Sequence, residues 1–324
     1  MKISIAMATY NGGGYLSAQL QSFIEQSRQP DELIISDDCS SDETEAIVKE
    51  FAKKAPFKVE FYKNVENLGY CRNFNAALMK TTGELVLLSD QDDVWLPGKI
   101  ACMEAVAQEN SRAMIIMNDA ALVDKDLNEL RLTKIGQIES AGLSLDTFVM
   151  GCCCAIRRNL LDICLPIPAS YPAHDDWIVG FAVGMNRRVI ERKVLQLYRR
   201  HENNESKFIA NRLTKVTRLD VFLNHLLKFF ISNRRSNRGV EIEGLNLFVA
   251  RLEELISVVN EVGESEISML YRIKSKELSD LKERHEVREK ALFHRIILII
   301  GRLVKGKYSS ENLLKEVAKD VAGF

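Results

Sequence analysis

Short apolar runs alternate with helical patterns over the first 90 residues, and this alternation constrains the fold more than any other feature of the chain. The apolar runs occupy residues 3–8, 33–36, 59–62 and 84–88. Segments with helical spacing of their apolar positions lie between them, at 15–26, 41–54 and 73–79. Strands that alternate with helices form mostly parallel sheets with right-handed crossovers. The pattern predicts an α/β fold with a mostly parallel sheet flanked by helices.

The composition changes near residue 205, and we expect a domain boundary there. All six prolines lie at or before Pro172, and long helical patterns follow at residues 219–231, 245–262 and 274–290. Residues 1–204 carry a net charge of −6, and residues 205–324 carry a net charge of +5. A chain of 324 residues suits one large domain and an extension. We expect an α/β domain over 1–204 and a helical C-terminal region over 205–324, which serves packing, oligomerisation or membrane association.

The seven cysteines indicate a reducing compartment. Their number is odd, three are adjacent at residues 152–154, and no CxxC pair occurs, so we expect neither a disulfide framework nor a zinc site. The first apolar run is too short for a signal peptide, and no run of 18 uncharged apolar residues predicts a membrane span. The overall net charge of −1 creates no field that attracts nucleic acid. We expect a cytoplasmic protein without a nucleic-acid partner.

Three carboxylates follow the fourth apolar run, at Asp90, Asp92 and Asp93. Carboxylates this close repel one another, and they persist at low cost when they are solvated or face a cation. Oxygen ligands suit Mg²⁺ or Mn²⁺, which can hold a diphosphate at the same time. The alternative is a solvated acidic turn. Because α/β sheets bind ligands where their strands end, and other strands here also end in polar residues, we favour the metal site.

Polar residues also follow the first two apolar runs. They are Thr9, Tyr10 and Asn11 after the first run, and Asp37 and Asp38 after the second. A carboxylate at such a strand end can accept hydrogen bonds from a nucleobase or a ribose. Ser41 or Asp42 provides an ordinary helix N-cap, which is the alternative explanation for this polar stretch. A cap does not account for two carboxylates at the tip of the strand.

Three later stretches offer further candidates. In HDDW, Asp175 or Asp176 can act as a general base, although the same residues could simply start a helix above a core tryptophan. In YRRHENN, arginine can pair with phosphate and His201 can ligate a metal, although such clusters are often solvated loops. The cysteines at 152–154 have no base partner nearby in the sequence, so we interpret them as small core residues and not as nucleophiles.

Taken together and in this order, these motifs resemble glycosyltransferase family 2, whose catalytic domain has the Rossmann-like GT-A fold. The matching stretches are ISIAMATYNGG, IISDDCSSDET, NLGYCRNFN, LLSDQDDVW, GCCCAIRR, HDDW and YRRHENN, and they end at about Asn204. The last three are looser than the first four. SDQDDVW, HDDW and the arginine-histidine motif are most similar to the rhamnosyltransferase-like branch of bacterial cell-surface polysaccharide enzymes.

The resemblance implies a role for each matching position. The nucleotide would lie beside Thr9, Tyr10, Asn11, Asn67, Gly69, Arg72, Asp90 and Gln91, with Asp37 or Asp38 on the base. The D-x-D pair corresponds to Asp90 and Asp92, with Asp92 as the principal metal ligand, and His201 occupies a position used for the metal or the diphosphate. Asp175 corresponds to the general base, with Asp176 as its rival. Many relatives have an acidic residue where His174 stands, which leaves the position of the base open by one residue.

The implied reaction is inverting transfer of a hexose from a nucleotide sugar to a hydroxyl of a cell-surface glycan or lipid-linked acceptor. Mg²⁺ or Mn²⁺ would stabilise the leaving diphosphate. The implied donor is dTDP-rhamnose or a UDP-sugar. Two alternatives are an inactive nucleotide-sugar-binding module and a nucleotidyltransferase. The latter class usually has a glycine-rich loop with Lys or Arg, and here neither residue occurs between Gly14 and Arg28.

The resemblance covers nothing after about residue 205. Residues 291–304, ALFHRIILIIGRLV, are apolar but too few to span a bilayer, and basic residues interrupt and follow them up to Lys307. Residues 291–307 could therefore contact the inner face of a membrane as a peripheral helix. The alternative is a helix packed on the catalytic domain or in a homo-oligomer.

Overall fold

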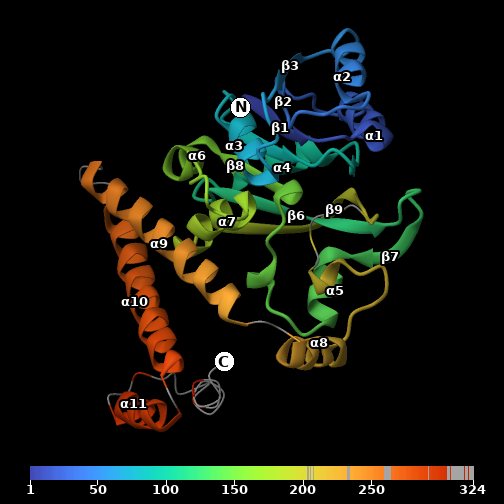
Figure 1. The fold of residues 1–324 in the computed structure, drawn as a ribbon. Coiled ribbons are helices and arrows are strands. Elements are labelled where there is room, and N and C mark those ends of the chain that lie inside the picture. The colour runs from blue at the N-terminus through green and yellow to red at the C-terminus, as the bar shows by residue number, and fades with distance from the viewer. Residues whose placement is uncertain are drawn as a thin grey trace. The chain divides into compact units, whose positions relative to one another are not determined.

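The computed structural model describes residues 1–202, 204, 206, 208–231, 234–258, 264–290, 292–304, 307, 317 and 320 (Figure 1). The chain divides into two compact units, Met1–Lys228 and Phe229–Phe324. The first unit contains the sheet, and the described part of the second is helical.

A nine-stranded sheet forms the first unit. Its order is β3 (Lys58–Lys63), β2 (Glu32–Asp37), β1 (Ile3–Thr9), β4 (Leu85–Ser89), β8 (Cys154–Arg157), β6 (Ile115–Val123), β9 (Arg188–Arg199) and β5 (Val94–Trp95), and β7 (Glu129–Thr133) pairs with β6. The first four strands are parallel, as the alternation predicts. The sheet as a whole is mixed rather than mostly parallel, because β8 runs antiparallel to both β4 and β6, and β5 and β7 are also antiparallel to their partners. The α/β fold is confirmed with this correction.

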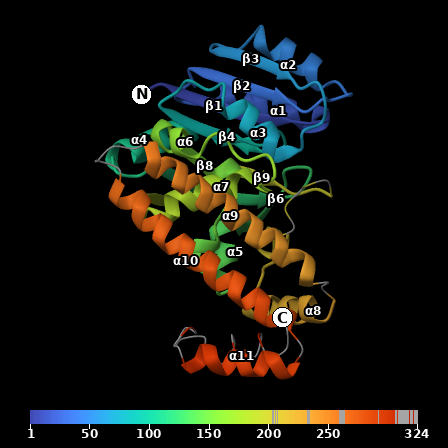
Figure 2. The same ribbon diagram turned by 60° about the vertical axis from the view of Figure 1, so that its left-hand side comes forward.

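Helices connect the strands of the sheet or follow its last strand, and four of them lie close to the predicted positions. They are α1 (Gly13–Ile24), α2 (Thr44–Ala52), α3 (Tyr70–Leu78), α4 (Lys99–Glu109), α5 (Lys134–Ser140), α6 (Arg158–Cys164), α7 (His174–Gly184) and α8 (Arg218–Ile231), with short 3₁₀ turns at Leu145–Thr147, Gly151–Cys153 and Ile209–Asn211. Figure 2 shows α1 to α3 with the parallel strands. The segments predicted at 15–26, 41–54 and 73–79 correspond to α1, α2 and α3.

The main core lies between the parallel strands and α1. Strand β1 is buried on both faces, as expected for a central strand of a parallel sheet. Helix α1 buries Leu16, Leu20 and Phe23, which recur at i, i+4 and i+7 and therefore share one face. Phe23 packs edge-on against Trp95 with ring centres 4.8 Å apart. Full burial of such side chains stabilises the fold by about 1.5–3 kcal/mol each.

Three side chains of α5 bind the segment that follows the sheet. Gln137 Nε2 donates to the carbonyls of Arg212 and Thr214 at 2.9 and 2.8 Å. Ser140 Oγ donates to the carbonyl of Val216 at 2.7 Å. The buried Lys134 donates to the side-chain oxygen of Asn211 in the same segment. These contacts explain why the first compact unit extends to Lys228 and not only to residue 204, where the composition changes.

The second unit is built from α9 (Arg234–Val258), α10 (Glu264–Glu289) and α11 (Leu292–Val304). Helices α9 and α10 lie side by side (Figure 2), and Leu252 and Leu270 are buried there. None of the helices among the described residues is long and apolar enough to cross a membrane.

Candidate active site

The parallel strands bring polar residues to one edge of the sheet. In the register of these strands, Thr9 lies opposite Asp37 on β2, and Met7 lies opposite Ser89 on β4. The residues that follow each strand are therefore neighbours, although they are up to 80 positions apart in the sequence. This edge contains most of the residues that the sequence assigns to the nucleotide and the metal.

Asp37 and Asp38 are buried, and their carboxylates are occupied by hydrogen bonds within the protein. Asp37 accepts a hydrogen bond from Thr9 Oγ1 at 2.8 Å and two from Ser40, at 2.9 Å from the backbone and 2.6 Å from the hydroxyl. Asp38 accepts hydrogen bonds from the backbone N–H groups of residues 68–69, at 2.7 and 2.8 Å. Both carboxylates therefore shape the loops around the strand ends, and a contact of either with a base stays a prediction.

Gln91 fastens the loop after β1 to the acidic loop after β4. Its side chain accepts a hydrogen bond from the backbone N–H of Tyr10 at 2.9 Å and donates one to the carbonyl of Tyr10 at 3.0 Å. Gly12 allows this approach, because a Cβ at that position would lie 2.2 Å from Gln91 Oε1. Asn11 has a positive φ of 45°, and its Oδ1 accepts a hydrogen bond from the backbone of Ser41 at 3.0 Å. The Tyr10 ring itself is exposed.

Asn67, Gly69 and Arg72 lie at the start of α3. Asn67 Oδ1 accepts a hydrogen bond from the backbone N–H of Gly69 at 3.1 Å, and Gly69 has a φ of 81°, in the region that favours glycine. Arg72 follows in the first turn of the helix with an exposed side chain. The loop that carries these residues is the one that Asp38 holds in place.

Asp92 and His201 meet across 109 positions of sequence. Asp92 Oδ2 lies 2.8 Å from His201 Nε2 and accepts a hydrogen bond from Asn204 Nδ2 at 3.1 Å. Tyr15 at the start of α1 stacks on the imidazole of His201 with ring centres 4.6 Å apart. The guanidinium of Arg199 lies over the ring of Tyr15. Two of the predicted metal residues are thus neighbours. The supporting role of Tyr15 was not predicted, since its place directly after a glycine-rich loop does not distinguish it from a core residue.

Asp90 lies close to the fully buried carboxylate of Asp93. Burial, with smaller contributions from the charges of Asp92 and Asp175, raises the pKa of Asp90 to about 7. Among the described residues, ligand atoms of Asp90, Asp93 and Cys152 lie within 4.8 Å of one another. Asp93 accepts hydrogen bonds from Gln196 Nε2 and the backbone of β9, and burial raises its pKa and that of the Cys152 thiol far above their usual values.

These side chains differ in their suitability for a divalent cation. Both carboxylate oxygens of Asp93 accept hydrogen bonds from β9. A protonated thiol such as that of Cys152 is a poor ligand for a hard cation. Asp93 and Cys152 therefore support the site from below the surface and do not bind the cation. Asp90 and Asp92 retain carboxylate oxygens, with an imidazole next to them. Burial is the main cause of the raised pKa of Asp90, and the neighbouring charges of Asp92 and Asp175 add to it; a bound cation would offset both effects. The donor set fits Mg²⁺ or Mn²⁺ at Asp90 and Asp92 with His201 beside them.

Helix α7 presents Asp175 and Asp176 in its first turn, and their surroundings differ. Asp175 Oδ2 accepts a hydrogen bond from the backbone of Gly151 at 3.2 Å, and its charge acts on Asp90. Asp176 is exposed and accepts a hydrogen bond from the hydroxyl of Tyr171 at 3.1 Å. Asp175 therefore faces the acidic cluster, whereas Asp176 contacts a tyrosine at the surface.

The neighbouring His174 is part of the core. It is buried and stacks on Phe74 with ring centres 4.0 Å apart, and burial lowers its pKa, so the ring is neutral. A Cβ at Gly151 would lie only 2.7 Å from His174 Nε2. Gly151, which begins the GCCC motif, therefore allows its turn to pack against His174. The backbone of the same turn donates the hydrogen bond to Asp175. The three cysteines of the motif are buried, as the sequence predicts for core residues.

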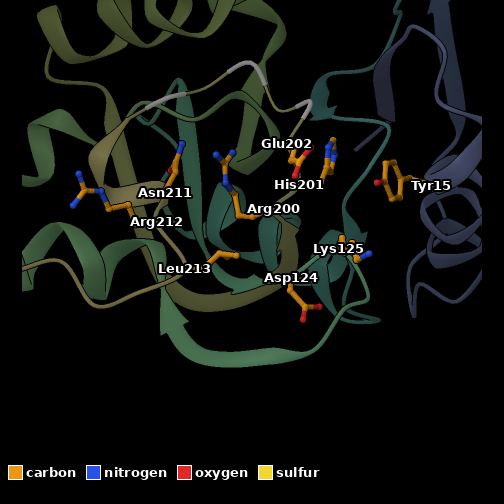
Figure 3. Close-up of a pocket in the computed structure, with 9 residues that line it drawn as sticks. All are labelled: Tyr15, Asp124, Lys125, Arg200, His201, Glu202, Asn211, Arg212 and Leu213. Carbon is orange, nitrogen blue, oxygen red and sulfur yellow. The ribbon is translucent and has the colours of Figure 1, made fainter.

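A pocket of about 680 Å³ adjoins His201 (Figure 3). Its lining residues are Tyr15, Asp124, Lys125, Arg200, His201, Glu202, Asn211, Arg212 and Leu213. Tyr15 and His201 lie at one side in Figure 3 and Asn211 and Arg212 at the other, with Arg200 between them. The pocket is thus bounded partly by the segment that α5 anchors, and it offers space for a substrate next to the Asp92–His201 pair.

The sequence is similar to known glycosyltransferases. The family described as "Glycosyl transferase family 2" matches residues 4–163. An uncharacterised glycosyltransferase of Nostoc is 33% identical over 38% of this chain and 38% of its own length. The dTDP-rhamnosyl transferase RfbG of Shigella flexneri is 29% identical over 61% of this chain and 73% of its own. The β-1,3-glucosyltransferase WfgD of Escherichia coli is 26% identical over 52% of this chain and 64% of its own. The chain thus spans less than two thirds of the first and third of these relatives.

Solved structures share the fold. TarS of Staphylococcus aureus in complex with UDP superimposes with a TM-score of 0.56 over the whole of this chain and 89% of that chain, at 17% identity. Its complex with UDP-GlcNAc gives 0.54 over the same shares, also at 17% identity. This likeness confirms the GT-A fold. The family match begins in β1 and ends in α6, so it includes the strand ends where Thr9, Asp38 and Asp92 lie. The matched part of the chain, residues 4–163, therefore belongs to glycosyltransferase family 2.

Proposed function

We propose that the protein transfers a sugar from a nucleotide-sugar donor to an acceptor hydroxyl, with inversion at the anomeric carbon. The observation that carries this proposal is the convergence of three carboxylates from two distant segments, the loop after β4 and the start of α7. Asp92 pairs with His201, and the charges of Asp92 and Asp175 both act on Asp90. A carboxylate suited to proton abstraction thus lies next to a site suited to a diphosphate and its cation.

In the proposed reaction, Asp175 holds the acceptor hydroxyl and takes its proton. The hydroxyl oxygen forms a bond to the anomeric carbon while the bond from that carbon to the diphosphate oxygen breaks, and the electron pair leaves with the nucleoside diphosphate. The hydrogen bond from Gly151 orients Asp175 for this task. Asp176 is assigned no proton transfer, because it faces Tyr171. Mg²⁺ or Mn²⁺ at Asp90 and Asp92 would stabilise the negative charge of the leaving group.

The nucleotide is proposed to lie along the ends of β1 and β2. The exposed ring of Tyr10 is available for stacking on a base, Arg72 is available for phosphate, and Thr9, Asn11, Asp37, Asp38, Asn67, Gly69 and Gln91 form the wall between them. The name of RfbG supports dTDP-rhamnose as donor, and the name of WfgD supports a UDP-sugar. WfgD is also named for a diphosphoundecaprenol acceptor, which supports a lipid-linked or cell-surface glycan as acceptor here.

The reaction is proposed to take place in the cytoplasm, at the inner face of a membrane. The support is the state of the cysteines, since all seven are free. Such a set, with Cys39 exposed, suits a reducing compartment.

Donor hydrolysis tests the proposed function. Purified protein is incubated with a panel of dTDP-, UDP- and GDP-sugars and Mg²⁺ or Mn²⁺, and release of nucleoside diphosphate is measured. We expect one donor to be hydrolysed, with loss of the activity in EDTA. Binding of donors without hydrolysis or transfer would indicate an inactive module, and preference for a nucleoside triphosphate with release of pyrophosphate would indicate a nucleotidyltransferase. Either outcome would contradict the proposal.

A further inference from the structure

Helix α11 leaves an apolar face uncovered. Its exposed large side chains include five that recur at i, i+1, i+4, i+7 and i+8, and these five define the apolar face of α11: Ile296, Ile297, Ile300, Leu303 and Val304. At about 100° per residue they span an arc of about 120°. Their exposed fractions range from 38% at Leu303 to 83% at Val304. We propose that this face binds the surface of an anionic lipid bilayer.

The side of the helix next to the apolar face is packed within the second unit, whereas Leu298 on the far side is exposed. Ile299 is buried in a small cluster with Val287 of α10 and Val317. Arg302, one turn later, is buried and forms an ion pair with Glu283 at 2.8 Å. Glu283 also pairs with Lys307 at 2.7 Å. Helix α11 therefore packs against α10 on one side, and the described residues of the second unit leave its apolar face exposed.

The length of the helix and its charges favour a bilayer surface as the occupant. The 13 residues of α11 extend over about 20 Å, which is too short for a hydrocarbon core of about 30 Å. Residues 290–307 contain five Lys and Arg residues and no Asp or Glu, and Glu283, which pairs with two of these cations, offsets one of the five charges. A helix with a strongly apolar face and a basic flank is the form that binds in the interface of anionic membranes.

The same charges argue against a second copy of the chain as the occupant. Two copies that joined their apolar faces would bring two basic segments of residues 290–307 together. Like charges at short distance repel, whereas the headgroups of an anionic bilayer have the opposite sign. The lipid surface therefore satisfies the apolar face and the charges at the same time.

Vesicle co-sedimentation of the full chain tests the proposal. The vesicles contain phosphatidylcholine alone or phosphatidylcholine with phosphatidylglycerol. We expect the protein to sediment with the anionic vesicles and to stay in the supernatant with the neutral ones. We expect the Ile297→Glu/Ile300→Glu double variant to lower the partition coefficient at least tenfold, because it places two charges on the apolar face. Val304→Glu, at the most exposed position of the face, should lower it severalfold.

A matched control is Met269→Glu on α10. Met269 is an exposed apolar residue of the same unit, and it lies outside the apolar face of α11. We expect this variant to bind vesicles as the unaltered protein does. Donor hydrolysis without vesicles should be the same in all four proteins, so a failure of the membrane proposal is distinguishable from a failure of the proposed function.

Several outcomes would overturn the proposal. One is the absence of sedimentation with anionic vesicles, and another is equal binding by the charged variants. A third is a dimer of the unaltered chain that the charged variants convert to a monomer without any vesicle binding, which would assign the face to a second copy. If the double variant aggregates, Val304→Glu alone decides between these outcomes.

Discussion

The donor side and the base side of the candidate site are built in different ways. The donor side, which we propose binds the nucleotide sugar, consists of residues 9–11 and 37–38 at the ends of parallel strands and residues 67–72 at the start of α3. The base side consists of Gly151, Asp175 and His201, which come from a turn, a helix start and a long loop. On the donor side the sheet register sets the geometry, whereas on the base side buried side-chain packing sets it. Substitutions on the donor side should therefore change donor affinity, whereas substitutions on the base side should change the rate of transfer or the melting temperature.

The largest effect is expected where the two sides meet. Asp92→Ala removes a carboxylate that contacts His201 and that we propose binds the cation beside the diphosphate. We expect both donor hydrolysis and transfer to fall by about 10³-fold or more, because both depend on stabilising the same leaving group. The melting temperature should stay close to that of the unaltered protein, since Asp92 lies in a loop. A variant of nearly normal rate, or an unaltered protein that works in EDTA, contradicts this prediction.

Asp175→Asn tests the base side alone. The change is nearly isosteric, and loss of a general base lowers rates by about 10²–10⁴. We expect kcat for transfer to fall in this range while the donor binds as before in calorimetry. Asp176→Asn is the matched control and should have a much smaller effect. A larger loss at Asp176 would move the base by one residue, and no loss at either would remove the base from this helix.

Replacing one glycine on each side with alanine tests how tightly that side is packed. Gly151→Ala places a methyl group against the buried, stacked ring of His174, and overpacking of this kind costs about 1–3 kcal/mol. Because Gly151 also holds Asp175, we expect transfer to fall by about 10²-fold. Gly12→Ala meets only the flexible end of Gln91 and should mainly weaken donor binding.

Gly14→Ala serves as the control for both, since an added Cβ there meets no atom within 4 Å. Calorimetry for donor affinity and thermal melting for stability give the readouts. Equal losses of donor affinity at Gly12 and Gly151 would contradict the division of the site into two sides.

The acidity of Asp90 predicts a pH dependence of metal binding. With its pKa raised to about 7, Asp90 is protonated below that pH, and a neutral carboxyl group is a weak ligand. We expect apparent Mn²⁺ affinity to fall by about tenfold per pH unit below 7 and to level off above it. Asp90→Asn should bind the metal weakly and with a flatter profile. An unaltered protein whose Mn²⁺ affinity is constant between pH 5.5 and 8 would show that Asp90 is not a ligand.

The smallest effect on activity is expected at Gln137, outside both sides. Gln137→Ala removes two hydrogen bonds donated to residues 212–214 and one accepted from the backbone of Val216 at 2.9 Å. Each contributes about 0.5–1.5 kcal/mol. We expect faster amide exchange at Val216 and a lower melting temperature, with donor hydrolysis almost unchanged. Unaltered exchange at Val216 would mean that α5 does not hold this segment.

The sequence predicts the donor side better than the base side, for physical reasons. Strand ends follow from local hydrophobic patterns, so the clustering of Thr9, Asp37 and Asp90 at one edge could be inferred. The burial of the Asp37 and Asp38 carboxylates could not, because their partners depend on where the loop at 68–69 folds back.

The base side depends on contacts between distant segments. The family resemblance assigned Asp92 and His201 separately to the metal or diphosphate, and no spacing in the sequence predicts that they contact each other. The antiparallel return of β8 and the buried partners Asp93 and Gln196 have no local signal, since an aspartate in an acidic turn reads as solvated. Strand direction after β4 and burial of polar groups are properties of the whole fold.

The anchors on α5 have a consequence for how this chain can diverge. Gln137 and Ser140 donate hydrogen bonds to backbone carbonyl groups of residues 212–216. Because every amino acid has this carbonyl group, the hydrogen bonds do not depend on which side chains the segment carries. The path of this segment is therefore insulated from the identity of its side chains. Arg212 and Leu213 on the pocket wall can be exchanged in evolution, or in a designed library, without dismantling the wall. If this pocket receives the acceptor of the proposed reaction, residues 212–213 could change to suit another acceptor while the catalytic residues keep their positions.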